Sequence, residues 1–152
     1  MMYSARVDIS APPNRVFAVL TDPSLLKLWT PEVIEARREG ELGVGAVHHA
    51  LVQEFGRRFP VKLIVTRYDR DTAIAYEMTT PMWTGNVEYL LKPQPRGTTL
   101  ELLFQPAAPE GWKRIPSVLA AMATRPVVQR IQRKRLEALR TVVETCPSPA
   151  ED

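Results

Sequence analysis

One arginine near the end of the chain stands where a charged side chain is unexpected. Arg135 lies in the middle of an apolar arc that a helix of about 100 degrees per residue forms from Val128, Ile131, Ala138, Leu139 and Val142. Burying a guanidinium is costly unless it is paired. We therefore expect one of two arrangements. Either Arg135 anchors an acidic or carbonyl group of a ligand, or its stem packs while the guanidinium reaches the sheet edge or pairs with a glutamate.

Two adjacent histidines, His48 and His49, are the next candidates. Successive strand residues point to opposite faces, so both cannot bind one metal ion, and the chain has no further histidine to complete a site. No metal is expected. His49 shares a face with Val47 and Leu51, which predicts that it points inward, where it could bond a ligand or move protons. The alternative is a histidine that is satisfied in the core or at the surface.

Aromatic residues follow the apolar faces of two neighbouring predicted strands. One face carries Ile74, Tyr76 and Met78, and the next carries Val87, Tyr89 and Leu91, with Trp83 at the hairpin between them. A tyrosine that points into a cavity offers an apolar body and one polar group. Plain core packing is the alternative, and Glu77 and Glu88 fall on the opposite, solvated faces. The predicted ligand-binding residues are His49, Leu51, Tyr76, Met78, Trp83, Tyr89, Phe104 and Arg135, and the candidates for catalysis among them are His49, Tyr76, Tyr89 and Arg135.

Other sequence motifs exclude several classes of function. Gly43-x-Gly45 lacks the third glycine and the following helix of a dinucleotide loop, and no phosphate loop, nucleophile elbow or metalloprotease helix occurs. Residues 113 to 140 hold eight basic side chains and one acidic one, which suits either a solvated helix face or an anionic surface. The segment lacks interleaved aromatics, so nucleic acid is not expected as a partner. Contact with an anionic membrane stays open as a third class of function.

Length and composition describe an ordinary globular chain. Its 152 residues match one domain, and 45% hydrophobic with 24% charged residues argues against disorder. The single cysteine, Cys146, excludes a disulfide framework. The N-terminus lacks a secretory pattern and no apolar run reaches about 18 residues, which predicts a cytosolic protein. We expect one domain over residues 1–146 and a disordered tail over 147–152, as a monomer or homodimer.

The elements follow from periodicity and turn residues. Alternation predicts a strand over 3–9, and Pro13 and Asp22-Pro23 begin two short helices. Turn residues then divide the middle into six strands, near 33–40, 45–55, 58–69, 72–80, 84–92 and 98–105. Their short connections require antiparallel pairing. A helix follows over about 116–144, with a kink or break at Pro126. This helix is the one element long enough to cover the concave face of such a sheet, and any gap left between them is a pocket.

The segments Val7–Asp22, Trp29-Thr30-Pro31-Glu32-Val33 and Lys92-Pro93 to Leu100 resemble the START-like, Bet v 1-like and polyketide cyclase/dehydrase superfamily. The resemblance spans residues 3 to 144. It implies an α+β helix-grip fold, in which a seven-stranded antiparallel sheet holds the C-terminal helix around an apolar cavity. It also implies cytosolic members that bind lipids, hormones or polyketides, or that catalyse cyclisation and dehydration.

From these observations we expect a protein that binds a hydrophobic small molecule with one polar or anionic end, and that needs no cofactor. The alternative is a polyketide cyclase, aromatase or dehydratase that uses the same cavity. Such an enzyme would act by shaping a flexible chain and by placing one or two proton-transfer groups.

Overall fold

The computed structural model describes residues 2–54, 56–81, 83–107 and 125–145. The elements in chain order are β1 (Tyr3–Ile9), α1 (Pro13–Leu20), a single turn of 3-10 helix η1 (Pro23–Leu25), α2 (Leu26–Trp29), β2 (Val33–Glu39), β3 (Val47–Glu54), β4 (Arg57–Asp69), β5 (Ala73–Thr79), β6 (Thr84–Gln94), β7 (Gly97–Ala107) and α4 (Arg125–Thr145). The predicted strands and short helices are confirmed, with small differences at their ends.

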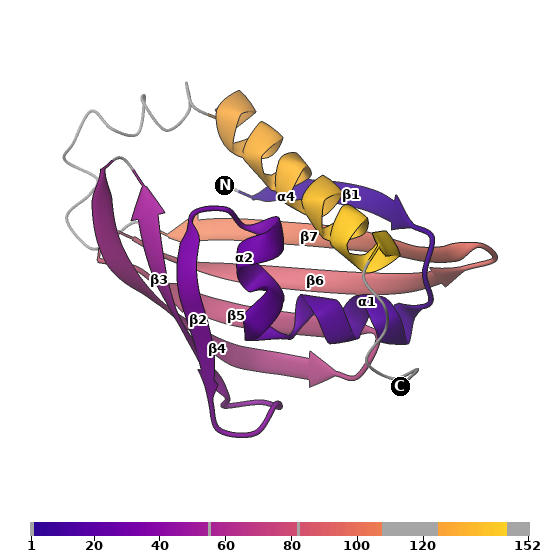
Figure 1. Cartoon of the computed structure of the whole chain (residues 1–152), viewed down its shortest axis with the longest axis horizontal. Helices are drawn as coiled ribbons and strands as arrows, with labels where there is room; N and C mark the ends of the chain where they lie inside the picture. Colours follow the sequence, from indigo (N-terminus) through magenta and orange to yellow (C-terminus); the bar gives the residue numbers. More distant parts are fainter. Residues whose placement is uncertain (1, 55, 82, 108–124, 146–152) are drawn as a thin grey trace.

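The strands form one antiparallel sheet in the order β1-β7-β6-β5-β4-β3-β2. Every strand from β2 to β7 pairs with its neighbour in sequence, and β1 closes the far edge against β7, where Tyr3 lies opposite Phe104. In Figure 1, α1, α2 and α4 lie on one face of this sheet. The predicted α+β helix-grip architecture is therefore confirmed.

The C-terminal helix packs mainly against β1, and it also contacts α1, α2 and β7. Residues 116–124 of the predicted helix and the predicted tail lie outside the described residues, and Pro126 is the second residue of the described helix. Arg130, Arg133 and Lys134, which belong to the basic segment 113–140, are exposed on the helix. Arg140 is half-buried and pairs with Glu137 one turn earlier.

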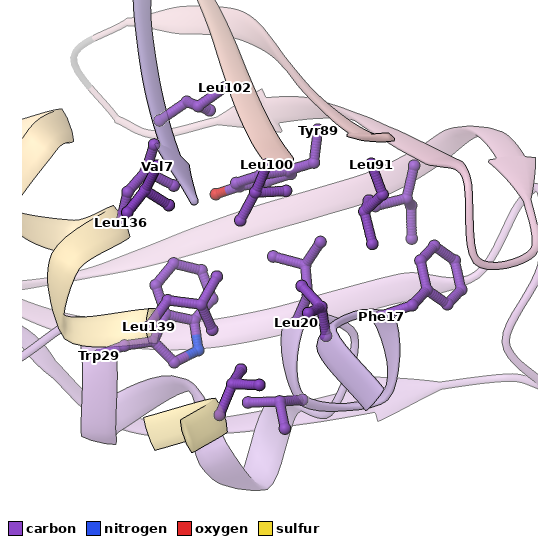
Figure 2. Close-up of a cluster of buried hydrophobic side chains, with 14 of the residues drawn as sticks. Val7, Phe17, Leu20, Trp29, Tyr89, Leu91, Leu100, Leu102, Leu136 and Leu139 are labelled. Carbon is purple, nitrogen blue, oxygen red and sulfur yellow. The ribbon is translucent and has the colours of Figure 1, made fainter. Parts of the chain in front are cut away.

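The predicted apolar arc of the helix is confirmed in part: Leu139 and Val142 are buried, but the side that faces the core is shifted toward Leu136 and Val143. Leu136, Leu139 and Val143 are at most 1% exposed, whereas Ile131 is 38% exposed. Figure 2 shows Leu136 and Leu139 beside Val7, Trp29 and Leu100. The sequence pattern missed Leu136 and Val143 because Arg135 was taken as the centre of the arc. The core stripe is Leu136, Leu139 and Val143, and Arg135 lies beside it.

Prolines and a short polar cap shape the segment after β1. Pro13 occupies the first turn of α1, and this helix buries Val16, Phe17, Val19 and Leu20. Asp22 then caps η1, because its side chain accepts a hydrogen bond from the Ser24 amide at 2.9 Å. These features direct the chain through α1, η1 and α2 without a long loop.

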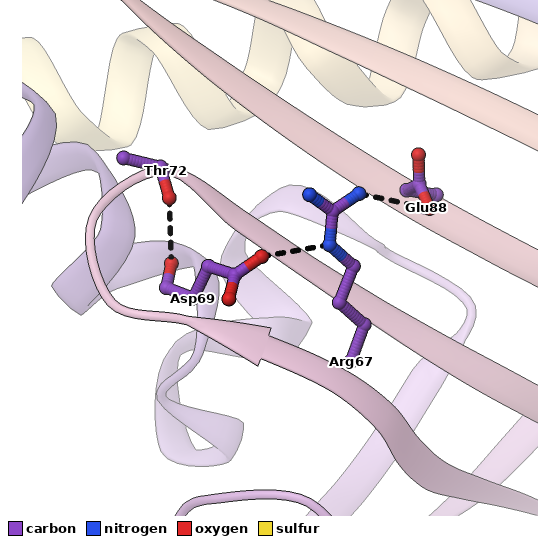
Figure 3. A network of polar contacts seen from close by, with 4 residues as sticks. All are labelled: Arg67, Asp69, Thr72 and Glu88. Atoms are coloured by element: carbon purple, nitrogen blue, oxygen red, sulfur yellow. Dashed lines mark hydrogen bonds and ion pairs between the residues drawn. The ribbon is translucent and has the colours of Figure 1, made fainter.

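The outer face of the sheet carries charged pairs. Arg67 bonds Asp69 at 2.7 Å and lies 3.6 Å from Glu88, while Thr72 donates to the Asp69 carbonyl, as Figure 3 shows. Glu77 is exposed, so both predicted outward glutamates lie on this face. Exposed pairs of this kind contribute little to stability because water and salt screen them, and the cohesion of the fold comes from the opposite face.

Gly97 at the β6–β7 turn is predicted to be intolerant of any side chain. A Cβ at this position would lie 2.0 Å from the Ile9 carbonyl oxygen, and φ is +153°. Backbone atoms cannot yield as a flexible side chain would, so Gly97→Ala should lower the free energy of unfolding by roughly 2–4 kcal/mol in urea denaturation. Gly40→Ala is the control, because Gly40 has φ +87° and open space around its Cβ. It should cost about 1 kcal/mol, and equal losses in the two variants would contradict the steric argument.

Candidate functional site

A cavity of about 320 Å³ lies between the sheet and the helices. Its floor is made by β3, β4, β5 and β6, and its other walls by α2, Phe104 of β7 and the first turns of α4. The cavity exists because α4 packs toward the β1 edge of the sheet and leaves the strands on the other side partly uncovered. Most lining side chains are aliphatic or aromatic, with a small polar group among them.

Six of the eight predicted site residues line this cavity: Tyr76, Met78, Trp83, Tyr89, Phe104 and Arg135. They come from β5, the β5–β6 hairpin, β6, β7 and α4, so the fold brings together positions that are up to 59 residues apart in sequence. Arg135 enters from α4 together with Val128, Ile131 and Gln132. These four positions form the strip of the helix that faces the cavity.

The prediction that His49 and Leu51 face the cavity is wrong. The cavity is lined by His48, Ala50, Val52 and Glu54 of β3, and His49 and Leu51 lie on the other face. His49 bonds Glu39 across the β2–β3 pair at 2.8 Å. Both faces of this strand carry apolar residues, so alternation could not choose between them, and a choice wrong by one residue inverts every position. The opposite choice would have identified His48 and Glu54.

The cavity floor contains a row of neighbouring aromatic rings, three of which carry polar atoms. His48 and Tyr76 have ring centroids 5.4 Å apart, Tyr76 and Tyr89 are 6.5 Å apart, and Tyr89 meets Trp29 at 6.4 Å. Trp83 meets Phe104 edge to face at 5.5 Å. His48, Tyr76 and Tyr89 are each 9% exposed or less. The row therefore places an imidazole and two phenols in a desolvated wall.

Burial shifts the pKa of each of these three groups. Desolvation lowers the pKa of His48 to about 4, with smaller contributions from Arg38 and His49. Desolvation likewise raises the pKa of Tyr76, and it raises the pKa of Tyr89 to about 12. At neutral pH the imidazole is unprotonated and both phenols keep their protons. The wall can accept a hydrogen bond at His48 and donate hydrogen bonds from the tyrosines.

The polar edge of the cavity is built on Arg135. Its Nη2 lies 3.1 Å from Oε1 of Glu32, which is the residue that follows Pro31 and precedes β2. The sequence left two arrangements open for Arg135, and the structure contains the one in which the guanidinium pairs with a glutamate. Glu54 lines the same cavity, and burial together with the negative charge of Glu32 raises its pKa, while Arg135 lowers it. The sequence indicated neither Glu32 nor Glu54.

Other features of the described residues are less suited to chemistry. These residues contain no group of three His, Cys, Asp or Glu side chains arranged to hold a metal. A wider hollow of about 570 Å³ lies outside the sheet between η1 and β2, with Arg37 and Arg38 on its rim, but its described lining has no buried titratable group. Among the described helices none has the length and apolarity needed to cross a membrane.

His48 should make stability depend on acid pH. The unfolded chain binds a proton at His48 near pH 6.5, whereas the folded protein does so only near pH 4. The unfolded state therefore holds more protons in this window, and stability is lost as pH falls, by up to about 3 kcal/mol. Urea unfolding at several pH values should show a smaller loss in His48→Gln than in wild type. His49→Gln removes only the smaller contribution of His49 and its bond to Glu39, so it should change the slope less than His48→Gln does. The wild-type slope in His48→Gln would refute the assignment.

Comparisons with known proteins support the fold. Residues 3–144 match the family described as polyketide cyclase/dehydrase and lipid transport. The aromatase/cyclase Zhui from Streptomyces sp. R1128 has a similar structure, with a TM-score of 0.77, 20% identity, and coverage of 95% of this chain and 93% of that chain.

Two further structures are similar over nearly their whole length. Protein TTHA0849 from Thermus thermophilus has a TM-score of 0.76, 18% identity, and coverage of 97% of this chain and 100% of that chain. Ara h 8.0201 has a TM-score of 0.71, 17% identity, and coverage of 95% and 98%. No curated protein matches the sequence. The family match across almost the entire chain, together with the observed grip of sheet and helix, shows that this chain belongs to the polyketide cyclase/dehydrase and lipid transport family.

Proposed function

We propose that this protein binds a hydrophobic small molecule in the cavity between the sheet and α4. The observation that carries the proposal is the cavity itself: about 320 Å³, with mostly apolar lining and a few convergent polar groups. Small-molecule sites have this character and begin at about 300 Å³. The family description, which includes lipid transport, supports the same function. The proposal includes the cytosolic location expected from the sequence.

Apolar contact supplies the binding energy, and polar contact supplies orientation. Val52, Phe59, Val61, Leu63 and Met78 form a continuous apolar surface on β3, β4 and β5. A ligand that covers this surface gains about 25 cal/mol for each Å² removed from water. The polar groups, including His48 and the Arg135–Glu32 pair, lie at other points of the wall and would set the ligand's direction.

A matched pair of substitutions on β3 tests whether the cavity binds ligand. Val52 lines the cavity and its neighbour Leu51 does not, while both are half-buried. A tryptophan at position 52 would fill the cavity, so Val52→Trp should weaken binding of the neutral dye N-phenylnaphthylamine at least about tenfold. Leu51→Trp places the same ring on the outer face and should bind like wild type. Dye fluorescence measures both affinities, and circular dichroism checks the fold.

Two results would contradict the proposal. One is wild-type protein that does not bind the dye. The other is Val52→Trp protein that is folded and binds as tightly as Leu51→Trp.

A second candidate function is cyclisation or dehydration of a poly-carbonyl chain, and the row of His48, Tyr76 and Tyr89 favours it. Neutral His48 can take a proton from the carbon between two carbonyls, and the resulting enolate carbon attacks a further carbonyl of the same chain. The alkoxide formed at that carbonyl takes the proton back from the His48 imidazolium. His48 then removes the second proton of the attacking carbon, a C=C bond forms, and the hydroxyl group takes that proton and leaves as water. Tyr76 and Tyr89 keep their protons at neutral pH and can donate hydrogen bonds to the enolate oxygen.

This second function predicts turnover of a short synthetic poly-β-ketone, followed by the ultraviolet absorption of the aromatic product. His48→Gln should reduce the rate by about 10²–10⁴, the contribution of a general base. His49→Gln should retain the wild-type rate, because His49 lies on the outer face. Absence of turnover by wild type, or an unchanged rate in His48→Gln, would exclude this activity.

A further inference from the structure

The described residues that line the cavity carry a net negative charge, although the chain as a whole is positively charged. Among the described lining residues three carry a carboxyl group, Asp22, Glu32 and Glu54, and Arg135 is the one that carries a positive charge. The whole chain has a formal net charge of +3. The net charge of the described cavity lining is therefore opposite in sign to that of the whole chain, and this sign bears on which ligand the cavity accepts.

Arg135 is not available to an anionic ligand without loss of its existing partner. Its Nη2 bonds Glu32 at 3.1 Å, and the two side chains are 27% and 24% exposed. A ligand carboxylate placed on this guanidinium would also lie beside Glu32, whose Oε2 is buried without a hydrogen-bond partner among the described residues. The repulsion between carboxylates in a poorly solvated wall opposes such binding.

Among the described residues Glu54 has no directly bonded cation, although the more distant charge of Arg135 partly offsets its own. The described residues give it no ion pair or hydrogen bond, and its backbone neighbour Gln53 donates to the Glu32 carbonyl at 2.8 Å, which holds the two glutamates at one edge. Burial and the charge of Glu32 raise the pKa of Glu54. A cation at this position would remove the unfavourable interaction between the two carboxylates, whereas an anion would increase it.

An independent feature of the same cavity also points to a ligand. His48 is 4% exposed, lines the cavity, and has an Nε2 without a hydrogen-bond partner in the described part of the chain. Because it is neutral at neutral pH, it does not balance the carboxylates, but a neutral imidazole can accept one hydrogen bond. Trp29 Nε1 is likewise buried and unpartnered; it can donate to a neutral ligand oxygen and carries no charge.

We propose that the cavity selects a hydrophobic amine, with its ammonium group at the Glu32–Glu54 edge and its apolar body on the sheet floor. The inference rests on the proposed binding function and names the ligand class for that site. It narrows the polar or anionic end expected from the sequence to a cationic one, because Arg135, the group that would have met an anion, is paired with Glu32. The ammonium group would contact Glu54 and the unpaired oxygen of Glu32, leaving the Arg135–Glu32 bond in place.

Three probes with one ring system test the charge preference: naphthylmethylammonium, naphthylmethanol and naphthylacetate. Each competes with the neutral dye N-phenylnaphthylamine for wild-type protein at neutral pH, and displacement gives its Kd. The ammonium probe should bind at least about tenfold more tightly than the carboxylate probe, with the alcohol between them. Equal binding of the two charged probes, or tighter binding of naphthylacetate, would overturn the proposal.

Substitution of Glu54 tests whether this carboxylate causes the preference for the ammonium probe. Glu54→Gln should reduce the ratio of the two affinities by about threefold or more, since a carboxylate partner is lost. Glu77→Gln is the matched control, because Glu77 is exposed on the other face of the sheet, and it should keep the wild-type ratio. An unchanged ratio in Glu54→Gln would refute the assigned edge.

The pH dependence gives a separate readout. The charged groups that face the cavity from the described elements are Asp22, Glu32, Glu54 and Arg135, with His48 titrating near pH 4. As pH rises through the raised pKa of Glu54 this carboxyl becomes negative, so the preference for the ammonium probe should increase in wild type. The increase should be reduced in Glu54→Gln, and an increase of wild-type size in that variant would contradict the role of Glu54.

The outcomes separate this inference from the function on which it depends. If the neutral dye does not bind, the binding function itself is wrong. If the dye binds and is displaced by all three probes without preference for the ammonium group, the cavity is a hydrophobic binding site and the charge selectivity is wrong.

Discussion

The organisation of this protein depends on how one helix covers a sheet that is wider than the helix. Seven strands present a concave apolar face, and α4 buries Leu136, Leu139 and Val143 mainly against the β1 edge. Side chains close-pack under the helix, as protein interiors do. Where the helix does not cover the sheet, residues of β3, β4, β5 and β6 line a cavity of about 320 Å³. The same packing that stabilises the fold thus leaves the space in which a ligand can be held.

The cavity has different chemistry at its floor and at its edge. On the floor, His48, Tyr76 and Tyr89 are withdrawn from water and are uncharged at neutral pH, and desolvation lowers the pKa of His48 and raises the pKa of both tyrosines. At the edge, where α4 meets the segment before β2, Arg135 and Glu32 remain about one-quarter exposed and are paired. The deeply buried floor is therefore neutral, whereas the charged groups of the cavity lie at its more exposed edge. Both features are consistent with the family, whose described activities span lipid transport and polyketide processing.

Much of the fold was predictable from local signals. Proline and glycine positions, alternation in Tyr3–Ile9 and the turns between strands predicted the order of elements, and the family resemblance predicted the grip. The facing of β5 and β6 was also predictable, because one side of each strand carries Tyr76 or Tyr89 with aliphatic neighbours while the other carries Glu77 or Glu88. Strand β3 was not, since Val47 and Leu51 on one face compete with Ala50 and Val52 on the other.

By itself, then, the sequence determined the elements, their antiparallel connection and most of the aromatic lining, since these follow from backbone preferences and two-residue periodicity that act over short distances. Tertiary structure alone decided that His48 faces inward, that Glu54 shares its wall, and that Arg135 meets Glu32 across 103 positions of chain. The physical reason is that the sign and availability of a buried charge depend on which partners the fold brings within a few ångströms, and no local pattern specifies those partners.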